Sequence, residues 1–176
     1  MNTSRRCFLA GTVGAVGLFA GCIANTEERT TGESVSAGGL VASVEDFLTA
    51  PELLDVDIDE PILPPEGAVY LLIHVVFEND ADVQRELPSS SEAELMYNDE
   101  EAPLADVGYE DTVVYQGTKY SVYRYNYGDV DAVFPGKSFE GWLIYTVPEN
   151  FQPSEAVLEI EVETEEDDVT GEWTLG

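Results

Sequence analysis

The chain contains little cysteine, histidine and lysine. Its 176 residues include two cysteines, one histidine at His74, and two lysines at Lys119 and Lys137. One histidine and no Gly-x-Ser-x-Gly turn give little support to nucleophilic catalysis, and no glycine-rich phosphate loop or cofactor motif occurs. Clustered Lys and Arg residues, which contact nucleic-acid phosphates, are also missing. We therefore predict that the chain is not an enzyme, needs no cofactor and binds no nucleic acid.

No apolar run is long enough to span a bilayer. The longest reaches from Cys7 to Ala20, about fourteen residues, whereas a bilayer core needs roughly twenty. It follows the pair Arg5 and Arg6 and leads into Leu-Phe-Ala-Gly-Cys at 18–22. This order of charged residues, apolar middle, small residues and cysteine resembles a twin-arginine export signal joined to a lipobox. The alternative, a short buried helix, is disfavoured by the glycines within the run.

The lipobox resemblance implies that Cys22 becomes the first residue of the mature protein and carries a lipid thioether. The protein would then be exported by the export machinery and anchored through this lipid to the outer face of the cytoplasmic membrane. Cys7 would leave with the signal, so the mature chain would have no disulfide. Its stability would have to come from an apolar core.

Acidic residues far outnumber basic ones. The chain has 36 Asp and Glu against seven Lys and Arg, a formal net charge of -29. Such self-repulsion destabilises a compact state at low salt, but near 1 M salt the Debye length is about 3 Å and the repulsion is largely screened. This lysine-poor composition resembles that of proteins from salt-loving archaea, so we interpret the charge as adaptation to a salty solvent. A cation store and a nucleic-acid mimic are the alternatives.

Composition divides the chain into three parts. Residues 1–22 form the signal, and residues 23–39, rich in Thr, Ser, Gly and Glu, are predicted to be a disordered tether with a mean reach of roughly 20–25 Å. In residues 40–176, short β-branched and aromatic runs alternate with turn residues, which predicts one all-β domain. Its strands are expected at Leu40–Leu48, Val69–Glu78, Ala93–Tyr97, Thr112–Gln116, Tyr120–Tyr127, Ser138–Val147, Val157–Val162 and Val169–Leu175.

A domain of this length can bury a sizeable core. The strand at 69–78 is the clearest, because every second residue from Val69 to Phe77 is apolar, while Tyr70, His74 and Glu78 share the other face. The residues expected in the core are Val69, Leu71, Ile73, Val75, Phe77, Leu95, Phe139, Trp142, Leu143, Tyr145, Val147, Leu158, Ile160 and Trp173.

Two stretches of this domain carry a resemblance to a known family. Residues 66–79 form a long strand that ends at an asparagine, and residues 135–148 follow the pattern Pro-Gly-x4-Gly-Trp-Leu-x-Tyr-x-Val-Pro. This resembles the immunoglobulin-like, telokin-like domain of unknown function, related to a secreted mycobacterial antigen, that is common on prokaryotic lipoproteins. The resemblance covers roughly residues 39–162. It implies an immunoglobulin-like β-sandwich of about seven to nine strands in an extracytoplasmic setting, and no catalytic residues.

Four acidic residues match the spacing of a calcium-binding EF-hand loop. Asp55, Asp57 and Asp59 alternate, and Glu66 lies eleven residues after Asp55, in the place of the twelfth loop residue. The sixth place should be glycine for the sharp turn but is Glu60, and a strand is expected to follow in place of a helix. Calcium binding by these four residues is one hypothesis, and a solvated acidic loop is the other.

Tyrosines gather in the middle of the chain. They stand near Lys119, and aromatic side chains beside cations suit contact with a protein partner or a sugar face. Cross-strand packing that shields a sheet edge is the alternative. The residues of this candidate contact surface are Tyr120, Tyr123, Arg124, Tyr125 and Tyr127.

Together these features predict an exported, lipid-anchored surface protein with a non-catalytic binding, adhesion or accessory role in the cell envelope, its partner an unidentified envelope protein or glycan. A calcium-binding protein is the first alternative. A carboxylate-dependent hydrolase is the second, and a carboxylate pair with a perturbed pKa in a cleft would favour it.

Overall fold

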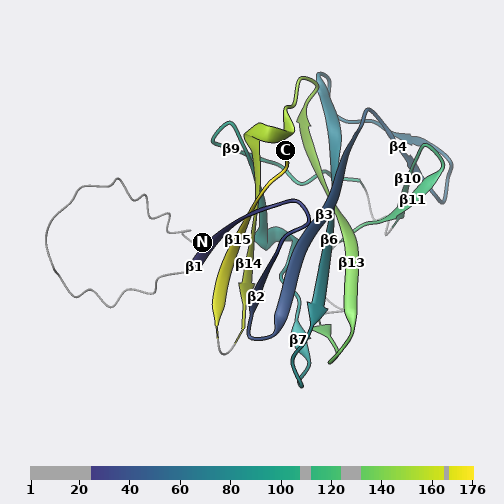
Figure 1. The fold of residues 1–176 in the computed structure, drawn as a ribbon. Coiled ribbons are helices and arrows are strands. Elements are labelled where there is room, and N and C mark those ends of the chain that lie inside the picture. Colours follow the sequence, from purple (N-terminus) through teal and green to yellow (C-terminus); the bar gives the residue numbers. More distant parts are fainter. Residues whose placement is uncertain (1–24, 108–111, 124–131, 165–166) are drawn as a thin grey trace, which may run out of the picture.

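The computed structural model describes residues 25–107, 112–123, 132–164 and 167–176, and the fold is a β-sandwich (Figure 1). The predicted all-β architecture is therefore confirmed. One layer is a five-stranded sheet with the strand order β1 (Asn25–Thr30), β15 (Asp168–Thr174), β14 (Ala156–Glu163), β8 (Ala93–Tyr97) and β9 (Glu100–Ala102). The other is a four-stranded sheet with the order β13 (Ser138–Pro148), β6 (Ala68–Asn79), β3 (Leu40–Ala50) and β2 (Ser34–Ala37).

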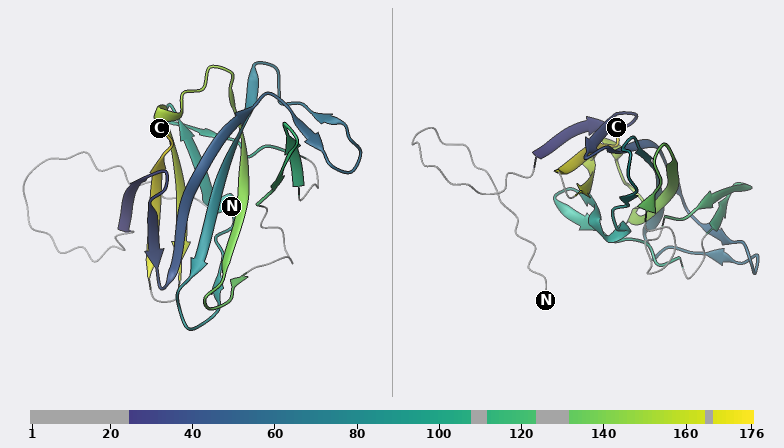
Figure 2. Two further views of the ribbon diagram at one scale, coloured as in Figure 1. Left: turned by 45° about the vertical axis from the view of Figure 1, so that its right-hand side comes forward. Right: turned by 90° about the horizontal axis from the view of Figure 1, so that it is seen from below.

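Two smaller sheets flank the sandwich. The arm sheet stands off the side opposite β1 (Figure 2) and consists of β11 (Thr118–Ser121), β10 (Thr112–Tyr115), β4 (Leu53–Asp55) and β5 (Pro61–Ile62). The tip ribbon, at the lower end in Figure 1, pairs β7 (Arg85–Glu86) with β12 (Ala132–Val133). Two single-turn 3-10 helices, η1 (Ser90–Glu92) and η2 (Pro153–Glu155), precede β8 and β14.

The sandwich core confirms most of the predicted core residues. Eleven are at most 1% exposed: Leu71, Ile73, Val75, Phe77, Leu95, Leu143, Tyr145, Val147, Leu158, Ile160 and Trp173. Two polar groups inside this core have partners, because the Tyr145 hydroxyl donates to the Ala93 carbonyl at 2.8 Å and Trp173 Nε1 donates to the Glu33 carbonyl at 2.8 Å. Burial raises the pKa of Tyr145, so its hydroxyl stays a donor.

A second apolar cluster lies on the outer face of the four-stranded sheet, beneath the arm sheet. It joins Leu53 and Val113 of the arm to Tyr70, Leu72 and Ile144 of β6 and β13. The face of β6 on which the sequence places Tyr70, His74 and Glu78 is therefore buried where the arm covers it, since Tyr70 is only 3% exposed. The sequence prediction misplaced the ring of Trp142, which packs against this outer cluster instead of the sandwich core.

A β-bulge in β3 changes which face of the sheet the side chains after it occupy. The register with β6 shifts between Val44, opposite Val75, and Asp46, opposite His74. Because of the extra residue, Phe47 packs against the same sandwich core as Val44, although strict alternation would have turned it outward.

The segment predicted to be a tether is partly strand. Residues 25–30 and 34–37 form β1 and β2, so the folded domain begins well before residue 40. Val35 and Ala37 enter the core at 2% and 1% exposure, and Glu33 accepts the indole hydrogen bond of Trp173. The polar composition misled the prediction because β1 and β2 are edge strands, in which Val35 and Ala37 enter the core but Thr26, Glu28, Thr30, Ser34 and Ser36 are exposed to solvent.

The structure explains the glycines in the pattern of residues 135–148 in steric terms. Gly136 has a positive φ of +67° in the turn before β13. A Cβ at Gly141 would lie 2.9 Å from Cβ of Tyr123, so glycine lets the chain at Tyr123 approach β13 and donate its N–H to the Trp142 carbonyl at 2.8 Å. Pro148 is the last residue of β13.

Asn79, at the end of β6, fastens the lower end of the sandwich. It is 1% exposed, and its Nδ2 donates to the carbonyls of Val83 at 2.8 Å and Val133 at 2.7 Å. Its Oδ1 accepts from the N–H of Ala81 at 2.9 Å, and its backbone carbonyl accepts from Gly136 N–H at 2.8 Å. One side chain thus links β6, the loop that follows it, and the tip ribbon.

We expect Asn79→Ala to lower the free energy of unfolding by about 3 kcal/mol, because it leaves the part-buried Ala81 N–H and the carbonyls of Val83 and Val133 without their partners. Urea unfolding followed by tryptophan fluorescence would measure the loss. The exposed Asn150→Ala is the matched control and should change stability little. Equal effects of the two substitutions would contradict this role of Asn79.

Candidate functional site

The acidic loop predicted to bind calcium is a hairpin between β4 and β5. Asp55 Oδ1 accepts from the N–H of Asp57 at 2.8 Å and of Ile58 at 3.2 Å, and Asp59 N–H donates to the Asp55 carbonyl at 3.1 Å. The backbone N–H of Asp55 donates to the Glu60 carbonyl at 2.9 Å. The carboxylate of Asp55 therefore already stabilises the turn of its own loop.

The loop geometry does not gather a calcium ligand set. Within residues 25–107, 112–123, 132–164 and 167–176, no group of three or more His, Cys, Asp or Glu side chains is placed to hold a metal ion. That statement covers Asp55, Asp57, Asp59 and Glu66. A solvated acidic loop, the other hypothesis, matches the hydrogen bonds observed.

The predicted tyrosine surface is divided by the structure. Tyr123 is 5% exposed, its hydroxyl donates to the Pro88 carbonyl, and its ring contacts Phe77 and Phe139, with ring centroids 5.6 and 5.2 Å away. A partner could not reach this ring, so its assignment to an exposed contact surface was wrong. Three further residues of that surface lie outside the described part of the chain: Arg124, Tyr125 and Tyr127.

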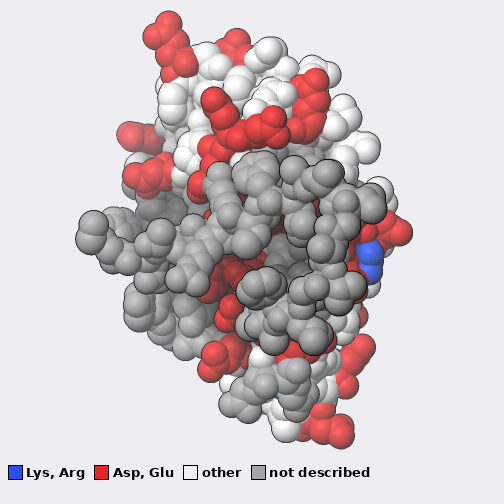
Figure 3. All heavy atoms as spheres, turned by 90° about the vertical axis from the view of Figure 1, so that its left-hand side faces the viewer, with Lys and Arg blue, Asp and Glu red and all other residues white. Residues whose placement is uncertain are grey.

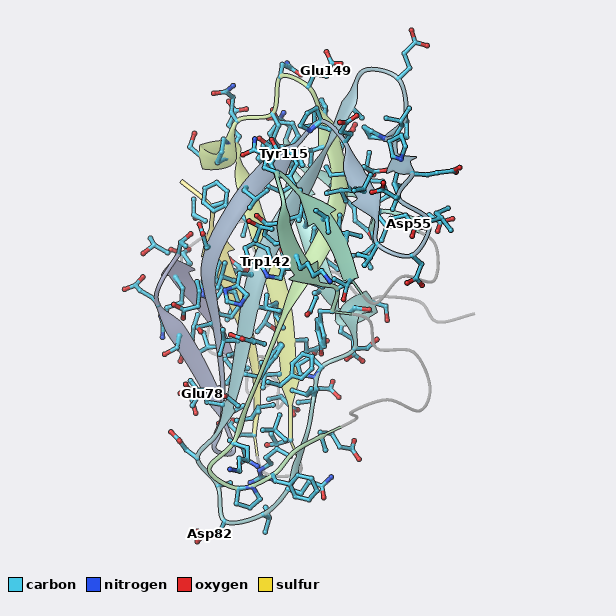
Figure 4. The ribbon with its side chains drawn as sticks, turned by 90° about the vertical axis from the view of Figure 1, so that its right-hand side faces the viewer. Asp55, Glu78, Asp82, Tyr115, Trp142 and Glu149 are labelled. Carbon is cyan, nitrogen blue, oxygen red and sulfur yellow. The ribbon has the colours of Figure 1, made fainter. Side chains whose placement is uncertain are left out.

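Tyr120 belongs to an aromatic stack on the outer face of β6 and β13. Its ring meets Trp142 edge-on at 4.9 Å, and Trp142 stacks on His74 at 4.7 Å with 14° between the ring planes. His74 Nε2 lies 3.6 Å from a carboxylate oxygen of Glu140. Figure 4 shows Trp142 in the middle of this face, with Tyr115 of the arm sheet above it. The chain's single histidine is thus packed between an indole ring and a carboxylate.

A hollow rich in carboxylates lies at the lower end of the sandwich, and we name it the acidic groove. One part, about 170 Å³, is lined by Glu86, Leu87, Pro88, Ser89, Glu92, Glu161 and Glu163. The adjoining part, about 650 Å³, is lined by Val83, Gln84, Arg85, Glu86, Glu163, Thr164 and Asp168. The groove therefore runs between the tip ribbon and the ends of β14 and β15.

Two elements position the carboxylates of the groove. Glu161 and Glu163 alternate with the buried Val162 on β14, so both point away from the core. Glu92 is held by the capping box of η1, in which its carboxylate accepts from Ser89 N–H at 2.6 Å and Ser89 Oγ accepts from Ser91 N–H at 3.2 Å. The sequence shows the alternation on β14, but only the fold brings it beside η1 and the tip ribbon.

Glu161 is the carboxyl of the groove whose pKa is shifted. Its pKa is raised above the ordinary value, first by partial burial and then by the negative charges of Glu163, Glu92 and Asp168. Such a carboxyl keeps its proton to higher pH than a fully solvated glutamate does. A cationic group bound in the groove would relieve this repulsion, and a proton-donating carboxylic acid beside ionised ones is also the arrangement that acid catalysis uses.

Carboxylates also face one another across the outer side of the five-stranded sheet. Glu159 lies opposite Glu94 on one side and Glu172 on the other, and Glu172 lies opposite Glu28. Like charges directly opposite each other destabilise a sheet in dilute solution. Further carboxylates are visible at the upper and lower parts of the left-hand face in Figure 3, around residues that are not described.

Comparisons with known proteins show the fold and no more. No family model matches the chain, and no curated protein sequence matches it. The solved structure of YjhA from Bacillus subtilis is similar with a TM-score of 0.52 at 14% identity, covering 82% of this chain and 99% of that chain. A protein of unknown function from Listeria monocytogenes gives 0.52 at 11% identity, covering 84% of each chain.

A candidate lipoprotein of Bacillus subtilis, YcdA, is also similar, with a TM-score of 0.51 at 17% identity. The match covers 84% of this chain but 39% of YcdA. In the described residues of our chain, no helix is both long and apolar enough to cross a membrane. Residues Arg5, Arg6 and Cys22 precede the described part of the chain.

The hydrogen bonds of Asp55 predict a structural role that does not depend on calcium. We expect Asp55→Ala to destabilise the domain by about 1 kcal/mol, since it removes a side-chain acceptor from two turn N–H groups. The loss should be equal in calcium and in a chelator, and Asp57→Ala should cost little. A calcium-dependent melting temperature that Asp55→Ala abolishes would overturn this assignment.

The position of Glu161 predicts a pH-dependent effect on stability. A carboxyl whose pKa is raised on folding destabilises the folded state once pH exceeds its unfolded value, because the folded state then has to give up a more tightly held proton. We therefore expect Glu161→Gln to raise the melting temperature at pH 7, with the gain vanishing as pH falls below 4.5, the ordinary value for this group. Scanning calorimetry at both pH values measures it. The exposed Glu149→Gln is the control; a gain equal at both pH values would refute the effect.

Proposed function

We propose that this chain is an exported lipoprotein whose β-sandwich domain has a non-catalytic binding or accessory role at the cell surface. The observation that carries the proposal is the order of features before the domain: Arg5 and Arg6, an apolar run too short to span, and Cys22 after small residues. The first strand of the sandwich begins at Asn25, directly after this segment. The similarity in fold to the candidate lipoprotein YcdA supports the same reading.

The chemistry of the domain supports a binding role. Its single histidine is stacked on Trp142 and lies beside Glu140, and the hydroxyls of Tyr123 and Tyr145 are committed to backbone carbonyls. Among the hollows of the described residues, the acidic groove combines several carboxylates with an open shape. We propose that it receives basic side chains or amino groups of an envelope protein or glycan, since those groups would offset its negative charge.

The negative charge supports an outer environment of high salt. The net charge of -29 and the row of opposed glutamates on the five-stranded sheet both repel within the fold. At about 1 M salt that repulsion acts over roughly 3 Å only. We propose that the surface is adapted to such a solvent, as in proteins of salt-loving archaea.

Export and lipidation are tested in a host with a twin-arginine pathway. Replacing Arg5 and Arg6 with lysine should leave the full-length precursor in the cytoplasm, and Cys22→Ser should remove the lipid mass from the N-terminal peptide. Cys7→Ser, which changes a cysteine inside the signal, is the matched control and should be processed normally. Mass spectrometry of the cytoplasmic and membrane fractions measures all three outcomes. An unmodified Cys22 in the wild-type protein would refute the proposal.

Glu161 favours a second candidate, a hydrolase that uses carboxylates. A glutamate with a raised pKa beside other carboxylates can act as a general acid. Assays of the wild-type protein with aryl glycosides in molar salt decide between the two. Turnover that Glu161→Gln abolishes and Glu149→Gln leaves intact would favour the hydrolase over the binding role.

A further inference from the structure

We propose that the sandwich is held directly on the bilayer, with its lower end, the end that carries the acidic groove and the tip ribbon, facing the lipid. This inference rests on the proposed lipid at Cys22. It adds an orientation and a contact surface, with the membrane that holds the anchor as the occupant.

The first step is the length of chain between anchor and fold. Only Ile23 and Ala24 separate Cys22 from Asn25, where β1 begins. Consecutive Cα atoms are 3.8 Å apart, so this connection spans about 11 Å when fully extended. The seventeen-residue tether expected from composition would have allowed free tumbling, whereas two residues do not.

The second step is the place where the connection joins the fold. Strand β1 is parallel to β15, and Asn25 lies opposite Val169. Val169 follows Asp168, which lines the acidic groove. By this register the connection joins the outer edge of the five-stranded sheet close to the residues from which β15 starts. In Figure 1 the start of β1 lies on the left flank of the sandwich, on the side of β15 away from β14 and above the tip ribbon. The C-terminal end of β15 points the opposite way.

The third step is a pair of exposed apolar side chains at this same end. Val83 is 55% exposed and Phe134 is 63% exposed, and they flank the two strands of the tip ribbon. Both are fixed in place, because Asn79 Nδ2 bonds to the Val83 carbonyl and Lys137 N–H donates to the Phe134 carbonyl at 3.0 Å. Phenylalanine and valine presented rigidly near a tethered membrane can enter its interface.

The arm sheet supplies a matched comparison. The loops on either side of β5 carry the other strongly exposed apolar pair of the described residues, Ile58 at 62% before the strand and Leu63 at 65% after it. These loops lie on the side of the sandwich opposite β1 (Figure 2). Figure 4 places Asp55 of the arm well away from Asp82, which precedes Val83 at the lower tip. In the proposed orientation the arm pair stays in water.

The negative charge of the groove determines the salt concentration at which this contact can form. The groove carboxylates repel anionic headgroups in dilute buffer, but at about 1 M salt the repulsion extends roughly 3 Å. Lipid contact by Val83 and Phe134 then gains apolar burial, which salt does not weaken. The orientation is accordingly tested in molar salt.

The experiment uses the lipidated full chain in vesicles of phosphatidylglycerol and phosphatidylcholine that contain headgroup spin-labelled lipid. Because Cys7 leaves with the signal and Cys22 is blocked, an engineered cysteine is the only free thiol for a fluorophore. Labels at Thr26→Cys and Gln84→Cys should be quenched several-fold more strongly than labels at Asp57→Cys and Glu149→Cys. A Gly-Ser spacer of about fifteen residues after Ala24, with a mean reach of about 20 Å, should reduce that difference.

Surface variants separate apolar contact from tethering alone. The double substitution Val83→Ser and Phe134→Ser should lower quenching at Gln84→Cys without changing the melting temperature. The double substitution Ile58→Ser and Leu63→Ser should leave the quenching at Gln84→Cys unchanged. Equal quenching at all four labels, or a pattern indifferent to both the spacer and the Val83/Phe134 pair, would overturn the orientation.

The anchor itself is checked first by mass spectrometry of Cys22. A chain without lipid refutes the proposed function. A lipidated chain whose four labels are quenched alike refutes only the orientation.

Discussion

The pairing of β6 with β13 is the constraint on which the rest of the molecule depends. Eleven residue pairs join the two strands in antiparallel register, and each strand contributes apolar side chains to both of its faces. The inner face meets β8, β14 and β15 in the sandwich core, while the outer face receives the arm sheet. A strand pair buried on both sides cannot slip by one residue without exposing one cluster and burying polar groups in the other, so its register also fixes the arm, the aromatic stack on Trp142 and the loop that ends at Asn79.

The sequence predicted the long strands well, because β14 alternates apolar and polar residues, every second residue of β6 from Val69 to Phe77 is apolar, and turn residues bound β6 and β13. It failed where tertiary contacts override composition. Residues 25–37 are mostly polar, yet their backbone pairs with β15 and β3, and Glu33 accepts the hydrogen bond of Trp173. Tyr123 looked like one face of an exposed strand, but the missing side chain of Gly141 opens the space that buries it. No local pattern marks either contact, since the partners are far apart in the chain.

For the candidate site as well, local patterns were recognisable in the sequence, whereas contacts between distant segments were not. The acidic loop and the tyrosines were recognisable as sequence patterns. In the structure the acidic loop is a hairpin whose turn is stabilised by Asp55, and Tyr123 is buried in the core. The acidic groove was not visible, because Glu86, Glu92, Glu161 and Asp168 come from four separate segments in a chain where carboxylates are common throughout. What distinguishes them is desolvation and mutual repulsion at Glu161, and both arise only when η1, the tip ribbon and β14 meet.

The pairing of β1 with β15 brings the first described strand beside the last one, across about 140 intervening residues, and closing a loop of that length costs roughly 4 kcal/mol in chain entropy. Sequence separation of this size places the contact late in folding. Until β1 docks, β15 presents a bare row of N–H and C=O groups that can template the addition of a strand from another molecule. An N-terminal segment that is cut away or held back would leave that edge uncapped, and the expected outcome is self-association of otherwise folded domains.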